Sequence, residues 1–465
     1  MQTTQIDSPN IDQSASVAGK TVVVGFAATV AMWVASFATH LPGVNLPPTA
    51  AGPIVLATLV LVAFWHGRGA GGIAPAAKLG LGGGLLAGFV TLLILGSYLV
   101  ETPAGDTPAP GAEGLKPGAV VSALGFIGAC AVLGLIGGLA GFKAAPSGRP
   151  GRDPLASFSI VACFSVIPLI VVGGAVTSTG SGMAVKGWPD SYGANMFLYP
   201  VSLMNNPRIY LEHTHRLFGS LVGLTTLVLT IWVLAKEPRK WVKFWAVCLF
   251  ILVCIQGLLG GLRVNNVSRG LAIGHAVLAQ LFFCLLVAHA AHLSGLYWAI
   301  RAEWSTPKDH RIKTWTTIMV HSTFLQLILG AVYRHTGQMH ALLTHAGFSL
   351  LVAVAALVAG FMLGARPPSD SPDAPFWKRL GTVLVGVVIA QFVLGWLAFF
   401  ALMGDKKPEP VMYDQLASAP AIDIAKALVA TAHQANGAFL FAIGTLAMVF
   451  ARRLVGVRDA APSAR

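Results

Sequence analysis

The feature that most constrains this chain is a succession of long apolar stretches that are nearly free of charge. A helix needs roughly 20 apolar residues to cross a hydrocarbon core about 30 Å thick, and these stretches lack the short alternating pattern of a membrane barrel. Only 11% of the residues are charged, whereas a soluble domain carries about 25%. We therefore predict an all-α integral membrane protein that is solvated by the lipid bilayer.

Twelve stretches are candidate spans, and the second is the shortest. They cover residues 21–39, 50–65, 79–100, 118–142, 158–176, 217–235, 244–262, 271–293, 315–333, 341–363, 380–403 and 427–450. Connections rich in Lys and Arg alternate with neutral or acidic ones, and basic connections stay in the cytoplasm. The pattern predicts a multi-pass protein of a bacterial-type inner membrane with both termini cytoplasmic and odd spans running outward.

The net charge of +13 does not indicate a nucleic-acid partner, because the basic residues are spread over short loops rather than gathered in one patch. All five cysteines lie inside apolar stretches without a Cys-x-x-Cys or Cys/His cluster. Neither a zinc site nor a disulfide framework is therefore indicated.

An internal repeat relates the odd and even spans. Three odd spans end in the same pattern, which runs from Gln256 to Gly260, from Gln326 to Gly330 and from Gln391 to Gly395, and residues 172–174 hold a degenerate copy. Each is followed by an even span with a histidine near its outer end: His215, His275, His345 and His433. The repeat predicts two pseudo-symmetric four-helix bundles, preceded by four extra N-terminal transmembrane helices.

A lone histidine within a membrane more often hydrogen-bonds a neighbouring helix than binds a metal. Four histidines at equivalent repeat positions lie at one depth, however, because a helix rises about 1.5 Å per residue. Two imidazoles can then approach an iron from opposite faces, as in cofactor sites inside helix bundles. We predict heme ligation by His215 with His275 and by His345 with His433. His213, His289, His292 and His321 are expected to pack or hydrogen-bond.

The two bundles differ chemically at one carboxylate. Glu212 lies one turn before His215 on the same helix face, where the second bundle has Leu342. An ionisable group at membrane depth is costly, so Glu212 is a candidate for moving protons or stabilising a developing cation. The alternative is that Glu212 hydrogen-bonds the first turn of its helix or pairs with Arg216.

Arginines just outside the ends of the predicted helices are candidates for contacts with heme propionates, because a guanidinium binds a carboxylate bidentately. Interfacial anchoring is the equally open alternative. The candidates are Arg216, Arg263, Arg269 and Arg334.

The string Glu212-x-x-His215-Arg216, with the preceding segment 173–183 and the Trp188-Pro189 loop, resembles heme A synthase, the cytochrome oxidase assembly protein 15 family. The likeness covers about residues 157–453. It implies oxidation of a ring methyl of heme O to the formyl group of heme A, with oxygen from water, for cytochrome oxidase assembly. It also implies a substrate site of Glu212, His215 and His275, and a heme b held by His345 and His433.

We expect three parts: an N-terminal four-span extension (residues 1–150), a first four-helix unit (residues 151–310) and a second one (residues 311–465). The resemblance implies that the first unit holds the substrate heme and the second the heme b. Heme O synthase and an electron acceptor are the partners it suggests, and a homo-oligomer is an open alternative. The loop from Thr177 to Tyr210 lacks the cysteine pair of some members, which excludes a thiol role there. The extension lies outside the family core and could dock a partner.

Two other functional classes compete with this reading. A bis-His di-heme membrane cytochrome would transfer electrons without substrate chemistry and would use the same histidines, so Glu212 discriminates between the two. A transporter would have broken helices with charged residues at the membrane midplane, whereas the charges here lie near the span ends.

Overall fold

The structure is a computed structural model and describes residues 17–101, 114–145, 153–300, 307–365, 373–402 and 409–454. Within these ranges it holds thirteen α-helices and three short 3-10 helices, and no β-strand. Twelve of these helices are long and apolar enough to cross a membrane. They coincide with the twelve predicted stretches, so the prediction of an all-α, multi-span membrane protein is confirmed.

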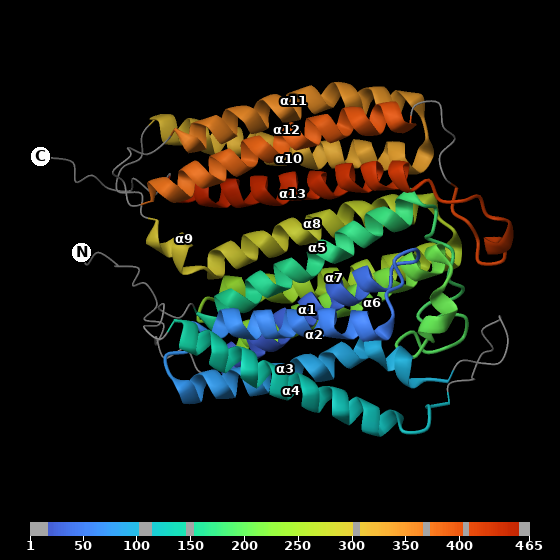
Figure 1. Ribbon diagram of the computed structural model, residues 1–465. Helices are drawn as coiled ribbons and strands as arrows, with labels where there is room; N and C mark the ends of the chain where they lie inside the picture. The colour runs from blue at the N-terminus through green and yellow to red at the C-terminus, as the bar shows by residue number, and fades with distance from the viewer. Residues whose placement is uncertain are drawn as a thin grey trace, which may run out of the picture. The chain divides into compact units, whose positions relative to one another are not determined.

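Figure 1 labels the helices in chain order. They are α1 (Val17–Thr39), α2 (Pro48–Gly67), α3 (Ile73–Leu95), α4 (Ala119–Ala144), α5 (Pro154–Ser178), α6 (Pro207–Lys236), α7 (Lys240–Asn266), α8 (Arg269–Leu293), α9 (Gly295–Ala299), α10 (Pro307–Thr336), α11 (Met339–Gly364), α12 (Ala374–Leu402) and α13 (Ile424–Leu454). The predicted domain limit between residues 150 and 151 lies outside the described residues, and the three-part division stays a prediction.

The chain packs as two compact units. Unit 1 contains the described residues up to Val172, together with Ser181–Pro238 and Pro410–Ala419. Unit 2 contains Gly173–Gly180, Arg239–Glu409 and Pro420 onward. The helices that carry the four repeat histidines are therefore shared between the units.

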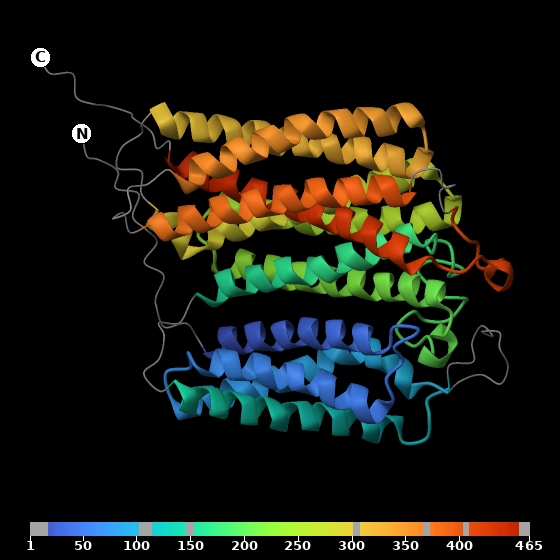
Figure 2. The same ribbon diagram turned by 45° about the horizontal axis from the view of Figure 1, so that its top comes forward.

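In unit 1, helices α1 to α4 form a four-helix bundle (Figure 2). Helix α3 packs against α1 and α4, and helix α2 also packs against α1 and α4. Glycines let α3 and α4 approach closely. A Cβ placed on Gly84 would lie 2.1 Å from the Cys130 carbonyl oxygen, and one on Gly134 would lie 2.4 Å from the Gly80 carbonyl oxygen. Membrane helices associate through such small-residue contacts, because lipid supplies no hydrophobic drive between helices.

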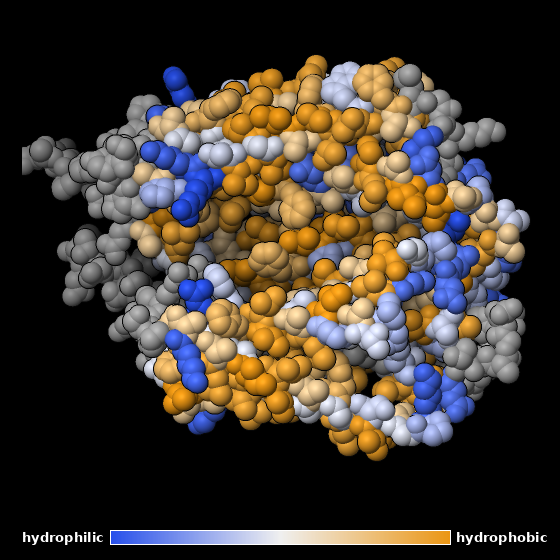
Figure 3. Space-filling model, in the orientation of Figure 1, coloured by the Kyte–Doolittle hydropathy of each residue, from blue (hydrophilic) through white to orange (hydrophobic). Residues whose placement is uncertain are grey.

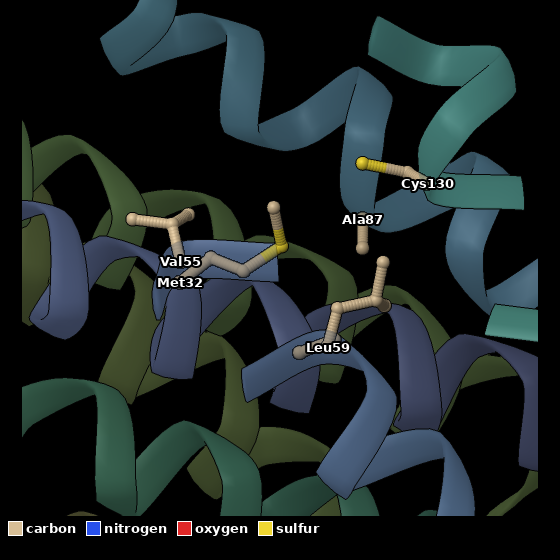
Figure 4. Packing of buried hydrophobic residues seen from close by; sticks show 6 residues of the cluster. Met32, Val55, Leu59, Ala87 and Cys130 are labelled. Carbon is tan, nitrogen blue, oxygen red and sulfur yellow. The ribbon is translucent and has the colours of Figure 1, made fainter. Parts of the chain in front are cut away.

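Figure 4 shows the centre of this bundle, where side chains from all four helices meet. Met32 of α1, Leu59 of α2, Ala87 of α3 and Cys130 of α4 are each fully buried. Apolar packing of this density makes any change of side-chain volume costly. The centre of the bundle is thus a packed apolar core.

Helix α6 packs against α1 and α5 within unit 1. Trp33 and Phe37 of α1 contact Phe218 of α6 with ring centroids 5.9 and 6.1 Å apart. The Tyr210 hydroxyl donates a hydrogen bond to the Phe37 carbonyl oxygen at 2.7 Å. On α5, Ser165 hydrogen-bonds Thr225 at 3.1 Å. Helix α1 therefore fixes one face of α6.

In unit 2, α10 to α13 form a closed four-helix bundle, and α8 packs on α7, α10 and α13. Large apolar side chains of both units face outward. Figure 3 shows hydrophobic residues along the helices and hydrophilic ones mostly near the helix ends. Val121 and Phe244, for example, are 74% and 71% exposed. Exposed apolar surface of this extent indicates contact with lipid.

Candidate functional site

Two of the repeat histidines meet inside the bundle of unit 2. His345 is the seventh residue of α11 and His433 the tenth residue of α13. Their ring centroids are 6.3 Å apart, and the ring planes make an angle of 85°. Both imidazoles are partly buried.

This spacing suits one metal ion between the two rings. A metal–imidazole bond of about 2 Å puts the ring centre roughly 3 Å from the metal, so two rings on opposite sides have centres about 6 Å apart. Among the described residues no group of three or more His, Cys, Asp or Glu is placed to hold a metal ion. A porphyrin iron needs only two axial ligands from the protein, so the pair fits heme better than a bare ion.

The repeated glutamine bonds the main chain of the histidine helix. Gln326 of α10 donates its amide to the His345 carbonyl oxygen at 2.8 Å, and the His345 Nδ1 lies 3.2 Å from the Gln326 carbonyl oxygen. A carbonyl can only accept, so Nδ1 carries the proton and the Nε2 lone pair is left for a metal. The Gln326 amide nitrogen lies 3.5 Å from that Nε2.

The same arrangement recurs at α7 and α8. Gln256 donates to the His275 carbonyl oxygen at 2.8 Å, and the His275 Nδ1 lies 3.2 Å from the Gln256 carbonyl oxygen. His275 is the seventh residue of α8, as His345 is of α11. The repeat in the sequence is therefore a repeat of one hydrogen-bonding geometry.

The repeated glycine, one turn after the glutamine, makes room for the imidazole. A Cβ on Gly260 would lie 3.0 Å from the His275 Cε1, and one on Gly330 would lie 2.8 Å from the His345 Cε1. Real Cβ atoms essentially never show a contact of 2.8 Å, and one of 3.0 Å is tighter than nine in ten, so glycine is the residue that lets each ring lie against the neighbouring helix. Sequence reasoning found these residues as a pattern but assigned them no function.

His433 lies against the third copy of the repeat. Its Nδ1 lies 3.3 Å from the side-chain nitrogen of Gln391, and a Cβ on Gly395 would lie 3.2 Å from its Cε1. The Gln391 oxygen accepts a hydrogen bond from Asn436 at 2.9 Å. The Gln391 side chain is thus held in place beside the His433 ring.

Arg334 lies one turn beyond Gly330 on the same face of α10. Its Nη2 is buried and finds no hydrogen-bond acceptor among the described residues. A buried guanidinium nitrogen needs an anionic or polar partner, and a heme propionate would supply one. Arg263 and Arg334 lie in the last turns of α7 and α10, and Arg269 begins α8, so the expectation that they lie just outside helix ends was wrong. The helices extend past the apolar stretches.

In unit 1, Glu212 is buried and both of its carboxylate oxygens have hydrogen-bond partners. One oxygen accepts the Val185 backbone N–H at 2.8 Å, and the other pairs with Arg216 at 2.8 Å. The side chains of Glu212 and Arg216 are only 5% and 8% exposed, so this pair is far stronger than one at a surface. The geometry is that of the alternative raised from the sequence, an i, i+4 ion pair.

Arg216 fastens the loop that follows α5 to the start of α6. Its Nη1 donates to the carbonyl oxygens of Gly187 and Asp190 at 2.8 and 2.9 Å, and its Nη2 donates to that of Val185 at 3.1 Å. Both terminal nitrogens are thus occupied, which weakens the case for Arg216 as a propionate contact.

In the same loop, burial raises the pKa of Tyr192 to about 12, and the Glu212 carboxylate adds to the rise.

The remaining histidines have protein neighbours. His213 is fully buried, with its Nδ1 3.1 Å from the Ser191 hydroxyl. His289 is fully buried, and its Nε2 lies 3.3 Å from the Val242 carbonyl oxygen. The His321 Nδ1 lies 2.8 Å from the Thr317 carbonyl oxygen. His292 is surrounded by the rings of Trp241, Trp245 and Tyr297.

His215 and His275 belong to different units, His215 to unit 1 and His275 to unit 2. His215 is the ninth residue of α6, one turn after Glu212. The structure describes each histidine within its own unit. Their pairing at a substrate heme therefore stays a prediction.

Comparison with known proteins identifies proteins that are similar to this chain. Residues 156–345 match the family described as cytochrome oxidase assembly protein, a range that contains His215, His275 and His345. A heme A synthase of Chelativorans sp. (strain BNC1) is 30% identical over 177 residues, which are 36% of this chain and 49% of that protein. One of Lysinibacillus sphaericus (strain C3-41) is 27% identical over 186 residues, 38% of this chain and 57% of that protein.

A longer alignment joins the chain to a heme A synthase of Nitrosomonas eutropha, at 22% identity over 284 residues, 54% of this chain and 74% of that protein. The chain spans about half the length of the first of these relatives. The family match runs from α5 to the first turns of α11, whereas the N-terminal bundle precedes it. Residues 156–345 are therefore similar to the cytochrome oxidase assembly protein family.

Proposed function

We propose that this protein is a heme A synthase that holds heme b between His345 and His433 and oxidises a ring methyl of heme O to the formyl group of heme A, with oxygen from water. The observation that carries the proposal is the imidazole pair of unit 2, with ring centroids 6.3 Å apart. Relatives named heme A synthase support it. Electrons removed from the methyl group pass to an acceptor whose identity is open.

The protein's own residues have distinct parts in this proposal. His345 and His433 would hold the heme b iron, and Arg334 would offer its buried Nη2 to a propionate. A bis-His heme exchanges single electrons, which is the chemistry that the cofactor supplies. Glu212, with His215 and His275, belongs to the substrate heme in the proposal.

The imidazole pair is tested by His345→Ala and His433→Ala, with His340→Ala as the control. His340 is an exposed histidine on the same helix as His345. Loss of one axial ligand opens the coordination shell, so each ligand variant should lose the low-spin heme spectrum while the protein still inserts. The control should keep it. Unchanged spectra in both ligand variants would remove the basis of the proposal.

The runner-up is a di-heme membrane cytochrome without substrate chemistry. The engagement of Glu212 by Arg216 and Val185 favours it, because a carboxylate with two partners has a structural function already. Expression with a heme O source, followed by extraction and mass analysis of the pigment, separates the two functions. Heme A in the extract supports the synthase, and unaltered heme O beside bound heme supports the cytochrome.

The cellular setting belongs to the same proposal. The helices place the protein in a membrane, and we propose the inner membrane of a bacterium with both termini in the cytoplasm. Heme O is hydrophobic, so it would reach the protein through the bilayer or directly from heme O synthase. A homo-oligomer would leave this assignment unchanged.

A further inference from the structure

A cluster of basic and aromatic side chains lies in unit 2 at the end of α13 that is remote from His433. Helices α8 and α13 both end there, beside the short helix α9 (Figure 1). Arg453 follows His433 by 20 residues on α13, which is about 30 Å of helix. A heme held by His433 does not reach this cluster, so the cluster needs an explanation of its own.

The indole ring of Trp298 is held in a fixed position at the centre of the cluster. Its Nε1 donates a hydrogen bond to the His292 carbonyl oxygen at 3.2 Å. Arg239 donates from Nη1 to the same oxygen at 3.1 Å, and its Cζ lies 4.9 Å from the centroid of the Trp298 ring. The end of α8 therefore carries an aromatic surface whose orientation is set by hydrogen bonds.

The guanidinium of Arg453 lies on this aromatic surface. Its Cζ is 5.0 Å from the Trp298 ring centroid and 5.3 Å from that of Tyr297, and its Nε donates to the Ile300 carbonyl oxygen at 3.3 Å. Among the described residues, neither of its terminal nitrogens, Nη1 and Nη2, has a hydrogen-bond acceptor or a carboxylate partner. Stacking holds a guanidinium in place and leaves its terminal N–H groups available for an anion.

The surroundings of Arg453 are both basic and apolar. Arg452 is exposed on the same turn of α13, and Lys240 begins α7. The two arginines outweigh the partial negative charge, about half an elementary charge, at the end of a helix. Leu296 and Trp241 are 45% and 47% exposed. An anion that carries apolar chains matches this combination better than a free anion does.

We propose that Arg453, stacked on Tyr297 and Trp298, binds the phosphate of an anionic phospholipid such as phosphatidylglycerol. The guanidinium fork donates two N–H bonds to the phosphate, and an acyl chain lies along the exposed Leu296. Basic residues mark this end of the helices as cytoplasmic, and the cytoplasmic leaflet attracts basic side chains through its anionic lipids. The lipid would tie α9 to the ends of α8 and α13. The inference is independent of the proposed function, because it involves no heme.

The test is native mass spectrometry of the full-length, delipidated protein, titrated in detergent with phosphatidylglycerol or phosphatidylcholine. Arg453→Gln should weaken phosphatidylglycerol binding roughly tenfold, because a bidentate charge-assisted pair is lost. Arg452→Gln removes the same charge one residue away from the aromatic surface and should stay within about twofold of wild type, as exposed ion pairs contribute little. Binding of phosphatidylcholine, whose headgroup has no net charge, should be the same in both variants.

Two further results decide between a built site and a general effect of charge. Arg453→Lys keeps the charge without the planar fork, so it should still lose about threefold or more in affinity, and it decides alone if Arg453→Gln does not accumulate. Equal phosphatidylglycerol affinities in the two glutamine variants, or wild-type affinity in Arg453→Lys, would overturn the inference. Excess inorganic phosphate should leave the lipid bound. Complete displacement by phosphate would make this a site for a free anion and overturn the assignment to a lipid.

Discussion

At the scale of single residues, one methyl group decides whether an imidazole fits between two helices. A Cβ on Gly330 would lie 2.8 Å from the His345 Cε1, while one on Gly347 would meet nothing within 4 Å. We predict that Gly330→Ala displaces the His345 ring and lowers heme content roughly tenfold or more, as loss of a group that orients a ligand does. Gly347→Ala should keep the wild-type heme-to-protein ratio, which absorbance measures. Equal ratios in both variants would contradict the tight fit.

Glu212 has two candidate functions, and its partner Arg216 separates them. General acid–base groups contribute about 10² to 10⁴-fold, or roughly 3 to 5 kcal/mol of barrier. If the carboxylate reacts, Glu212→Gln should lower heme A formation by that factor with little loss of bound heme. Arg216→Gln removes the same ion pair and three bonds to loop carbonyls but keeps the carboxylate, so it should lose less activity. Equal losses would leave Glu212 as a loop anchor.

The sequence predicted the histidines of this site but not the function of the residues that hold them in place, and the reason is physical. A glutamine and a glycine four residues apart reveal one helix face, but not which neighbouring helix lies against it. The pattern could therefore be seen at Gln326 and Gly330 without its function. The loop bonds of Arg216 go to main-chain carbonyls, which leave no trace in the side-chain sequence. The role of Asn436 depends on two helices and was not predicted.

At the scale of elements, hydropathy predicted every span but not where the spans begin. The structure starts α6 at Pro207, whereas hydropathy places the start at residue 217. Glu212, His213 and Arg216 lower the hydropathy of this turn, yet they are hydrogen-bonded to the loop that covers it. Hydropathy measures the cost of facing lipid, and these side chains face protein instead.

The contact of α1 with α6 gives the N-terminal bundle a structural function. Phe218 is fully buried against Trp33 and Phe37. We predict that Phe218→Ala costs about 3–5 kcal/mol of stability, as for other buried aromatic residues. Phe164→Ala, at a position 58% exposed within the same unit, should change the thermal unfolding temperature far less. Similar shifts would mean that α1 does not brace the helix carrying Glu212 and His215.

At the scale of the whole molecule, the distribution of charge predicts which side of the membrane each helix end faces. Arg239, Lys240 and Lys243 cluster where α7 begins, and basic residues resist transfer across the membrane during insertion. The helix ends at Asn266, and its 27 residues are about 40 Å long, enough to span the hydrocarbon core. The start of α7 should therefore be cytoplasmic and its end external.

Cysteine labelling tests this orientation within one helix, so the result is independent of how the two units are arranged. Lys240 and Asn266 are both exposed, and the five natural cysteines lie within helices that can span the membrane. In intact spheroplasts, a membrane-impermeant maleimide should label Asn266→Cys but not Lys240→Cys above the background of the parent protein. Permeabilised cells should show both. Labelling of Lys240→Cys in intact spheroplasts would reverse the topology, and it would put His275, which follows directly on α8, near the cytoplasmic face.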